Sequence, residues 1–265
     1  MTKMKISIVI PAYNEEARIG KTLEAYAKFF NSLAKAKGFS YRILVVINGT
    51  TDKTEEIVKC CQKKFESINY LNFKRAGKGF AITEGFKDSI KKDFNIIGFV
   101  DADLATYPEE YLKLISSIDN FDGAIANRYA KNSKIIPAFS FRRILVSRVF
   151  NFLVRVLFHL PYEDTQCGAK VFKKDAIKKI LNNITMTQWA YDIDLLYICK
   201  TNNLKIKSVP TIWLEKEGTK LNIIKSSIQM LFAIIQLRIL KSPFKKSLRI
   251  LSPIIGIIYK LVRGI

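Results

Sequence analysis

Short apolar runs alternate with amphipathic segments along the first half of the chain. The apolar runs are rich in β-branched residues and predict strands at residues 5–11, 41–48, 69–74, 94–101 and 123–128. The segments between them have helical spacing and predict helices at residues 17–37, 51–65, 79–92 and 108–118. Apolar strands that alternate with helices indicate an α/β domain with a mostly parallel sheet covered on both faces.

Polar residues follow four of these strands. In an open parallel sheet, ligands bind at the carboxyl ends of the strands. Those ends fall at residues 11–15, 48–52, 74–78 and 101–106. The glycine patterns of dinucleotide-binding and P-loop proteins are absent near the first strand, so we expect a binding edge of another kind.

The second half begins with a longer amphipathic helix, predicted at residues 140–160. Its apolar face consists of Ile144, Leu145, Val149, Phe152, Leu153, Val156 and Leu157, and its narrow polar stripe of Arg148, Asn151, Arg155 and His159. This pattern fits a helix that lies on a membrane. It fits equally a core helix with its arginines in solvent, and both interpretations stay open.

The remaining segments predict a loop running into a strand at 163–172, a helix at 189–200 and a strand at 205–216. From residue 222 onward, apolar and basic residues interleave, and no uninterrupted apolar run is long enough to span a bilayer. We therefore expect interfacial helices there. The predicted division is a catalytic domain at 1–221, which includes helix 140–160, and a membrane-interface segment at 222–265.

Charge and cysteine content narrow the functional classes. The net charge of +21 predicts attraction to an anionic partner such as nucleic acid, an acidic membrane or a phosphorylated substrate. The single histidine and four scattered cysteines argue against a zinc site or a disulfide framework and favour a reducing compartment. The N-terminal residues lack the layout of a signal peptide.

Two carboxylates, Asp101 and Asp103, end the fourth predicted strand in the stretch FVDADLAT. Carboxylates held this close repel each other unless a cation bridges them. Mg²⁺ or Mn²⁺ suits this need, because such ions bind oxygen ligands and substrate phosphates together. The alternative is that Asp103 caps the next helix and Asp101 is a solvated loop residue.

Similar features lie at the other strand ends. Glu15 is placed to reach a nucleotide, although Asn14 and the glutamates after it are also typical of a helix start. In RAGKG, Arg75 and Lys78 stand among glycines, where a backbone can approach phosphate, or the stretch is simply a basic turn. Their combination on one predicted edge favours a site.

These motifs together resemble family 2 glycosyltransferases of the GT-A fold. The matching stretches are IVIPAYNEEARIGKTL, INGTTDKT, RAGKG and VDADLAT. The later stretches EDTQCGAKVFKKDA, WAYDIDLLYI and TIWLEKEGTKL resemble dolichyl-phosphate β-glucosyltransferases, relatives of dolichyl-phosphate mannose synthases. The resemblance runs from about residue 5 to 240.

The resemblance implies a role for each matching residue. The residues implied to bind the nucleotide sugar are Pro11, Tyr13, Glu15, Asn48, Arg75, Lys78, Asp101, Ala102 and Asp103. Asp103, with Asp101, would hold the metal. Arg128 and one of Arg142 or Arg143 would bind the acceptor phosphate. Asp164 and Gln166 would approach the donor sugar, and Trp189 and Asp192 the acceptor. The implied catalytic set is Asp103, Arg128, Asp164, Gln166 and Asp192.

Two departures from the family pattern bear on the donor. Ile47 and Asn48 stand where the nucleotide loop usually carries paired aspartates, and the Asn48 amide is expected to contact a base edge. Ala105 stands where mannose synthases commonly carry glutamine, which resembles the glucosyl branch.

The resulting hypothesis is an inverting, metal-dependent hexosyltransferase on the cytoplasmic face of a membrane. It would move glucose from UDP-glucose to a polyprenyl phosphate such as dolichyl phosphate. GDP-mannose, N-acetylglucosamine donors and another acceptor stay open as alternatives. A basic, non-enzymatic nucleic-acid-binding module is the remote alternative, but it leaves Asp101 and Asp103 unexplained and the chain lacks an RNA-binding signature.

Overall fold

A computed structural model describes residues 4–185, 190–215 and 223–242. The strands are Lys5–Ala12 (β1), Ser40–Asn48 (β2), Ile68–Phe73 (β3), Ile96–Val100 (β4), Gly123–Asn127 (β5), Lys134–Ile136 (β6), Ala169–Lys173 (β7), Ile206–Pro210 (β8) and Ile212–Leu214 (β9). The helices are Ile19–Lys37 (α1), Thr54–Lys64 (α2), Lys78–Lys91 (α3), Pro108–Ser116 (α4), Phe141–Phe158 (α5), Lys174–Asn183 (α6), Tyr191–Thr201 (α7) and Ile223–Leu240 (α8).

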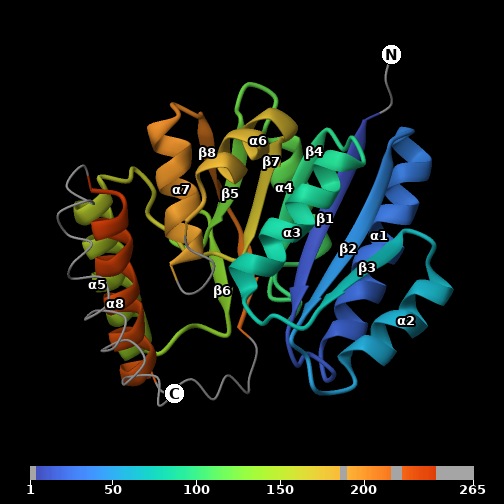
Figure 1. Cartoon of the computed structure of the whole chain (residues 1–265), viewed down its shortest axis with the longest axis horizontal. Helices are drawn as coiled ribbons and strands as arrows, with labels where there is room; N and C mark the ends of the chain where they lie inside the picture. The colour runs from blue at the N-terminus through green and yellow to red at the C-terminus, as the bar shows by residue number, and fades with distance from the viewer. Residues whose placement is uncertain (1–3, 186–189, 216–222, 243–265) are drawn as a thin grey trace.

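A seven-stranded sheet in the order β3-β2-β1-β4-β7-β5-β8 forms the centre of the molecule (Figure 1). Neighbouring strands are parallel except that β7 runs antiparallel to both β4 and β5. The predicted α/β architecture with a mostly parallel sheet is confirmed. A second, two-stranded sheet pairs β6 with β9.

Helices cover both faces of the large sheet. On one face, α1 and α4 pack over alternate side chains of the strands, including Ile6, Ile8 and Ile10. On the other face, α3, α6 and α7 pack over the intervening positions, including Val9 and Phe99. The strands are apolar at successive positions because both of their faces are buried.

The second half departs from several predictions. The predicted strand at 205–216 is two strands in different sheets, β8 and β9, because the chain changes sheet between Pro210 and Ile212. Helix α6 and strand β6 were not predicted. Helix α1 begins at Ile19, so Asn14 is no helix cap; it lies in the preceding turn with a φ of 53°.

Helix α5 turns most of its predicted apolar face outward, which contradicts the core-helix interpretation, one of the two left open by the sequence. Its buried side chains are Phe150, Asn151, Val154 and Phe158. Its exposed side chains include Phe141, Leu145, Val149, Phe152 and Val156, of which Phe141 is 78% exposed. Asn151, which was predicted to lie in the polar stripe, is only 4% exposed. The predicted domain boundary at 221/222 and the segment from 243 onward lie outside the described residues.

Candidate functional site

One edge of the sheet gathers the sequence motifs. The parallel strands β1, β2, β3, β4 and β5 all end at this edge, at the bottom of the sheet in Figure 1. Because β7 is antiparallel, its first residue lies there, and the loop at 163–168 that precedes it reaches the same edge. The antiparallel strand therefore places Asp164 and Gln166 beside the loops that follow β4 and β5.

Asp101 lies against the start of α3 and against the loop before β7. Its Oδ1 is 2.6 Å from the Lys78 Nζ, and its backbone N–H donates to the Gly168 carbonyl at 3.1 Å. Burial alone would lower the pKa of Lys78, but the carboxylates of Asp101 and Asp192 raise it above its usual range. Lys78 is therefore a permanent cation beside the first carboxylate.

Asp103 lies in a tight turn that is fixed on both sides. Its Oδ1 accepts from the Ala105 N–H at 3.0 Å, and Leu104 between them has a φ of 58°. The Thr22 hydroxyl donates to the Ala102 carbonyl at 2.7 Å and thereby ties the turn to α1. Burial and the charge of Asp101 raise the pKa of Asp103 above its ordinary value.

Glu15 adds a third carboxylate to this edge. Arg18 donates to both of its oxygens at 2.8 Å, and the backbone N–H of Glu15 donates to the Thr54 hydroxyl at 2.8 Å. Burial raises the pKa of Glu15, with smaller contributions from Asp103 and Asp101. Arg18, which the sequence did not single out, offsets this acidic group at short range.

The two carboxylates Asp101 and Asp103 fit a divalent cation. Within the described residues no group of three or more His, Cys, Asp or Glu is arranged to bind a metal. Mg²⁺ and Mn²⁺ nevertheless commonly use only one or two protein carboxylates and complete their shell with water and substrate phosphate. Burial and, after it, the charge of Asp101 raise the pKa of Asp103, and a bound cation would favour its ionised form.

The predicted nucleotide residues fall into two groups. Tyr13 and Arg75 are exposed beside the edge, and the Arg75 guanidinium lies 4.6 Å from the centre of the Phe80 ring. Pro11 is buried in β1. Asn48 is also buried, and its side chain joins loops: Nδ2 donates to the Ala12 carbonyl at 2.9 Å and Oδ1 accepts from the Gly77 N–H at 2.9 Å. The Asn48 amide thus fixes the loops, whereas the sequence predicted a base contact.

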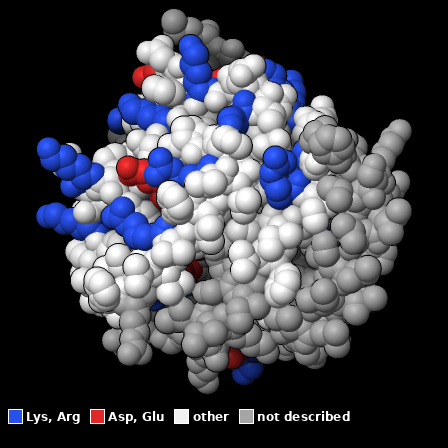
Figure 2. All heavy atoms as spheres, turned by 90° about the vertical axis from the view of Figure 1, so that its left-hand side faces the viewer, with Lys and Arg blue, Asp and Glu red and all other residues white. Residues whose placement is uncertain are grey.

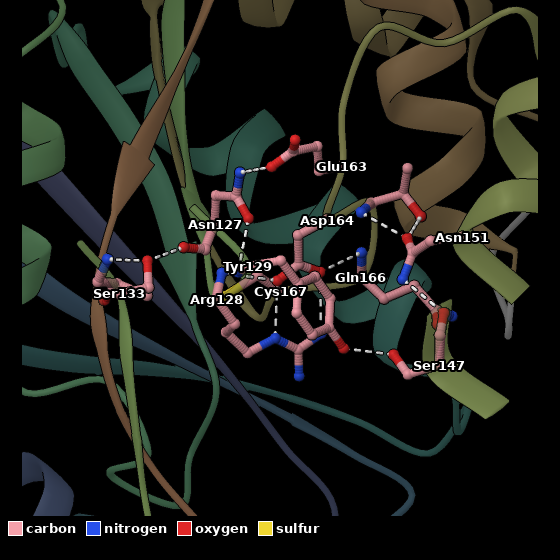
Figure 3. Close-up of polar contacts among 12 residues, drawn as sticks. Asn127, Arg128, Tyr129, Ser133, Ser147, Asn151, Glu163, Asp164, Gln166 and Cys167 are labelled. Carbon is pink, nitrogen blue, oxygen red and sulfur yellow. Dashed lines mark hydrogen bonds and ion pairs between the residues drawn. The ribbon is translucent and has the colours of Figure 1, made fainter. Parts of the chain in front are cut away.

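Arg128 and Asp164 form a buried, bidentate ion pair (Figure 3). The Arg128 Nε lies 2.7 Å from Oδ2 and Nη2 lies 2.9 Å from Oδ1, while the Arg128 backbone N–H also donates to Oδ2 at 3.0 Å. Burial would raise the pKa of Asp164, but Arg128 lowers it. In the described residues Nη1 has no hydrogen bond to protein, so one edge of the guanidinium is left for a ligand.

Of the other predicted acceptor and sugar residues in the described part of the chain, Gln166 contacts this pair directly. Gln166 donates its backbone N–H to Asp164 at 3.3 Å and is half-buried. Arg143 pairs with Glu215 and packs over the Phe139 ring. Arg142 lies at the start of α5, and Trp189 lies outside the described residues.

Asp192 is bound by a buried lysine that the sequence analysis missed. The Lys170 Nζ is fully buried and lies 2.6 Å from the Asp192 Oδ1 and 2.7 Å from the Cys167 carbonyl oxygen. A charged residue in the middle of the apolar strand AKVFK was the available signal, because a lysine is rarely buried without a partner. The pairing makes Asp192 a positioned anion rather than a solvated one.

Comparison with known proteins identifies the family of this chain. The family model for glycosyl transferase family 2 matches residues 7–181. Dolichyl-phosphate beta-glucosyltransferases of Dictyostelium discoideum and Homo sapiens are both 31% identical, over 88% and 85% of this chain and 73% and 72% of their own lengths. That of Saccharomyces cerevisiae is 30% identical over 85% of this chain and 71% of its length.

Solved structures show the same fold. Glucosyl-3-phosphoglycerate synthase from Mycobacterium tuberculosis in complex with UDP superposes with a TM-score of 0.65 at 18% identity, over 89% of this chain and 80% of that one. The same enzyme with Mn²⁺, UDP-glucose and phosphoglyceric acid gives a TM-score of 0.66 at 17% identity, with the same coverage. The predicted GT-A fold, the enzyme class and the family resemblance are confirmed: the chain belongs to glycosyl transferase family 2.

Proposed function

We propose that this enzyme transfers glucose from UDP-glucose to a membrane polyprenyl phosphate such as dolichyl phosphate, with inversion at the anomeric carbon. One arrangement carries the proposal: the carboxylates Asp101 and Asp103 share a sheet edge with Arg128, and α5, which contacts the loop at Thr165, exposes an apolar face. The names of the relatives support glucose as the sugar and dolichyl phosphate as the acceptor.

The donor is held along the β1–β4 half of the edge. Asp103, with Asp101, would hold Mg²⁺ or Mn²⁺, which neutralises negative charge on the leaving diphosphate. Lys78 and Arg75 supply further positive charge near the phosphates. Tyr13 offers an exposed ring and Glu15 an acidic group for the nucleoside. Asn48 and Pro11 shape this part of the site from beneath.

The acceptor phosphate is held by arginine. Arg128 donates hydrogen bonds from Nε and Nη2 to Asp164, which leaves Nη1 to bind the phosphate. Arg142 and Arg143 lie at the start of α5. Asp164 and Gln166 face the donor sugar. A guanidinium suits this task because it remains charged and binds phosphate oxygens with directed hydrogen bonds.

The chemistry needs positioning more than proton transfer. A lipid phosphate is already an anion at neutral pH, so its oxygen attacks the anomeric carbon without a general base. The new C–O bond forms as the bond to the nucleoside diphosphate breaks, and the electron pair leaves with the diphosphate. Holding the two substrates in line supplies a large part of the acceleration.

The enzyme acts at the cytoplasmic face of a membrane in this proposal. No helix among the described residues has the length and apolar character to cross a bilayer. The exposed apolar side chains of α5 would instead enter the interface. Figure 2 faces the side that carries α5 and α8, where Lys and Arg gather above an area of uncharged surface and acidic groups are few. Such cations favour anionic headgroups.

A radiochemical assay tests the function. The full chain is incubated with labelled UDP-glucose, GDP-mannose or UDP-N-acetylglucosamine and with polyprenyl phosphate in vesicles, with Mn²⁺, Mg²⁺ or chelator. We expect label in the chloroform phase with UDP-glucose and metal, and none with chelator. Product from GDP-mannose or UDP-N-acetylglucosamine alone would overturn the choice of sugar, and product only with soluble acceptors would overturn the lipid acceptor.

A further inference from the structure

A buried amide connects α5 to the loop at 163–168. Asn151 lies on the inner side of α5 and is 4% exposed. Its Oδ1 accepts from both the backbone N–H and the hydroxyl of Thr165, at 3.1 and 2.9 Å, and its Nδ2 donates to the Ser147 carbonyl at 3.0 Å (Figure 3). An amide is costly to bury unless its polar atoms are paired, and Asn151 meets that requirement across two elements.

Thr165 stands between the two residues proposed to face the donor sugar. It is fully buried, and both of its hydrogen-bond donors go to Asn151. Its neighbours Asp164 and Gln166 therefore cannot move away from α5 without breaking these bonds. Asp164 is ion-paired with Arg128. A shift of α5 would therefore also affect Arg128, on the acceptor side of the site.

The same helix carries the exposed apolar face. Phe152 is 62% exposed and Val156 is 54% exposed, one and five positions after Asn151. One side of the helix thus contacts the site, and the opposite side is exposed and can bind a lipid surface. If a lipid surface binds the protein more tightly when α5 is in one position, it increases the fraction of molecules with α5 in that position.

We infer that Asn151 is a positioning residue: when α5 binds a lipid surface, Asn151 holds Asp164 and Gln166 in place through its hydrogen bonds to Thr165. The inference rests on the proposed function for the roles of those two residues. Asn151 touches no substrate in this scheme. It acts through Thr165, and its loss uncouples the loop from the membrane-facing helix.

Hydrogen exchange measures the coupling without relying on turnover. In the full-length wild type, anionic vesicles of phosphatidylcholine and phosphatidylglycerol should slow exchange of the 163–168 amides by about 5-fold or more. Thr165→Ser keeps the hydroxyl and should keep this response. Thr165→Val and Asn151→Ala should lose most of it, while vesicle binding and the affinity for UDP with Mn²⁺ stay unchanged. Thr165→Val preserves shape, so it provides the test if Asn151→Ala fails to fold.

Turnover provides the second readout. With UDP-glucose and a short, water-soluble isoprenyl phosphate, empty vesicles should raise the wild-type and Thr165→Ser rates by about 5-fold or more and the Thr165→Val rate far less. Equal vesicle stimulation in Thr165→Val, or unchanged loop protection in the wild type, overturns the inference. A rate loss of the same factor with and without vesicles also overturns it and indicates a purely structural role. Loop protection without any glycosylated product would instead refute the proposed function alone.

Discussion

At the scale of single residues, the Asp101 carboxylate packs directly against the Cα of Gly168. A methyl group built on Gly168 would overlap both Oδ2 and Cγ of the Asp101 carboxylate. The backbone of Gly168 also accepts the hydrogen bond from Asp101, so neither residue can simply move aside. The glycine that ends DTQCG is therefore a spatial requirement of the carboxylate in DADLAT.

Gly168→Ala should displace the Asp101 carboxylate and weaken the binding of UDP with Mn²⁺ by about 10-fold or more, as expected when a charge-assisted contact is lost. Titration calorimetry measures this affinity. Gly20→Ala is the matched control, because its new methyl group would meet only the Ile57 side chain, at 3.2 Å, and no carboxylate. Wild-type affinity in Gly168→Ala would contradict the steric explanation.

The ionised carboxylate of Asp103 lowers the stability of the folded, metal-free protein. Burial and Asp101 raise its pKa in the folded protein, so the fold holds this proton more tightly than the unfolded chain does. The free energy of unfolding therefore falls as pH rises from the unfolded pKa through the folded one. At neutral pH the charged carboxylate destabilises the metal-free protein.

Asp103→Asn removes that charge. Without metal at pH 7, the variant should melt at a higher temperature than the wild type, and the difference should disappear at low pH where Asp103 is protonated. With Mn²⁺ and UDP the wild type should gain stability and the variant little, because only the wild type binds them tightly. Turnover should fall by about 100-fold or more. Lower metal-free stability of the variant in calorimetric scans would contradict this account.

At the scale of elements, a buried ion pair fastens α8 to α7. The Lys241 Nζ, just beyond the end of α8, lies 2.8 Å from the Asp194 Oδ1 and donates to the Asn183 carbonyl at 2.9 Å. Asp194 is fully buried and also accepts from the Thr185 backbone at 2.7 Å. The pair and the Asn151–Thr165 contact attach α8 and α5, respectively, to elements that carry site residues.

Lys241→Met should lower the free energy of unfolding by about 3 kcal/mol, because it leaves the Asp194 charge buried without this cation. Urea denaturation measures the change. Lys87→Met serves as the control: its ion pair with Glu84 is exposed, and its loss should change stability by less than about 0.5 kcal/mol. Similar midpoints for the two variants would show that the α8 attachment contributes little.

At the scale of the whole molecule, charge and apolar surface are available on the same side. The net charge of +21 favours anionic surfaces at long range, and the exposed face of α5 provides area for insertion at short range. The two contributions differ in their response to salt, since screening weakens only the electrostatic one.

The full chain should therefore sediment with anionic vesicles at low salt and less completely at high salt. Phe152→Ser combined with Val156→Ser should reduce vesicle affinity by about 100-fold, because each burial contributes about 1.5 kcal/mol or more. Met4→Ser, at an exposed apolar residue just before β1, is the control and should bind like the wild type. Protein that stays in the supernatant at low salt would refute membrane docking.

The sequence predicted more of the sheet edge than of the second half. The strands before residue 128 are mostly apolar runs, and parallel strands end at one edge, so the meeting of Asp101, Lys78 and Glu15 followed from pattern alone. The structural role of Asn48 and the partner of Lys170 could not be predicted in this way. Asn48 is a polar residue at a strand end, as a ligand-binding residue would be. Only its buried hydrogen bonds with Ala12 and Gly77 show that it fixes loops.

The sequence by itself determined the fold class, the family and the main binding edge, because hydrophobic periodicity and short motifs are local properties. Only the tertiary structure decided which side of α5 is buried, that β7 enters between β4 and β5 against their direction, and that Asp192 pairs with Lys170. These depend on contacts between segments far apart in the chain. A helix with apolar residues on more than one side fits several packings, and its neighbours select among them.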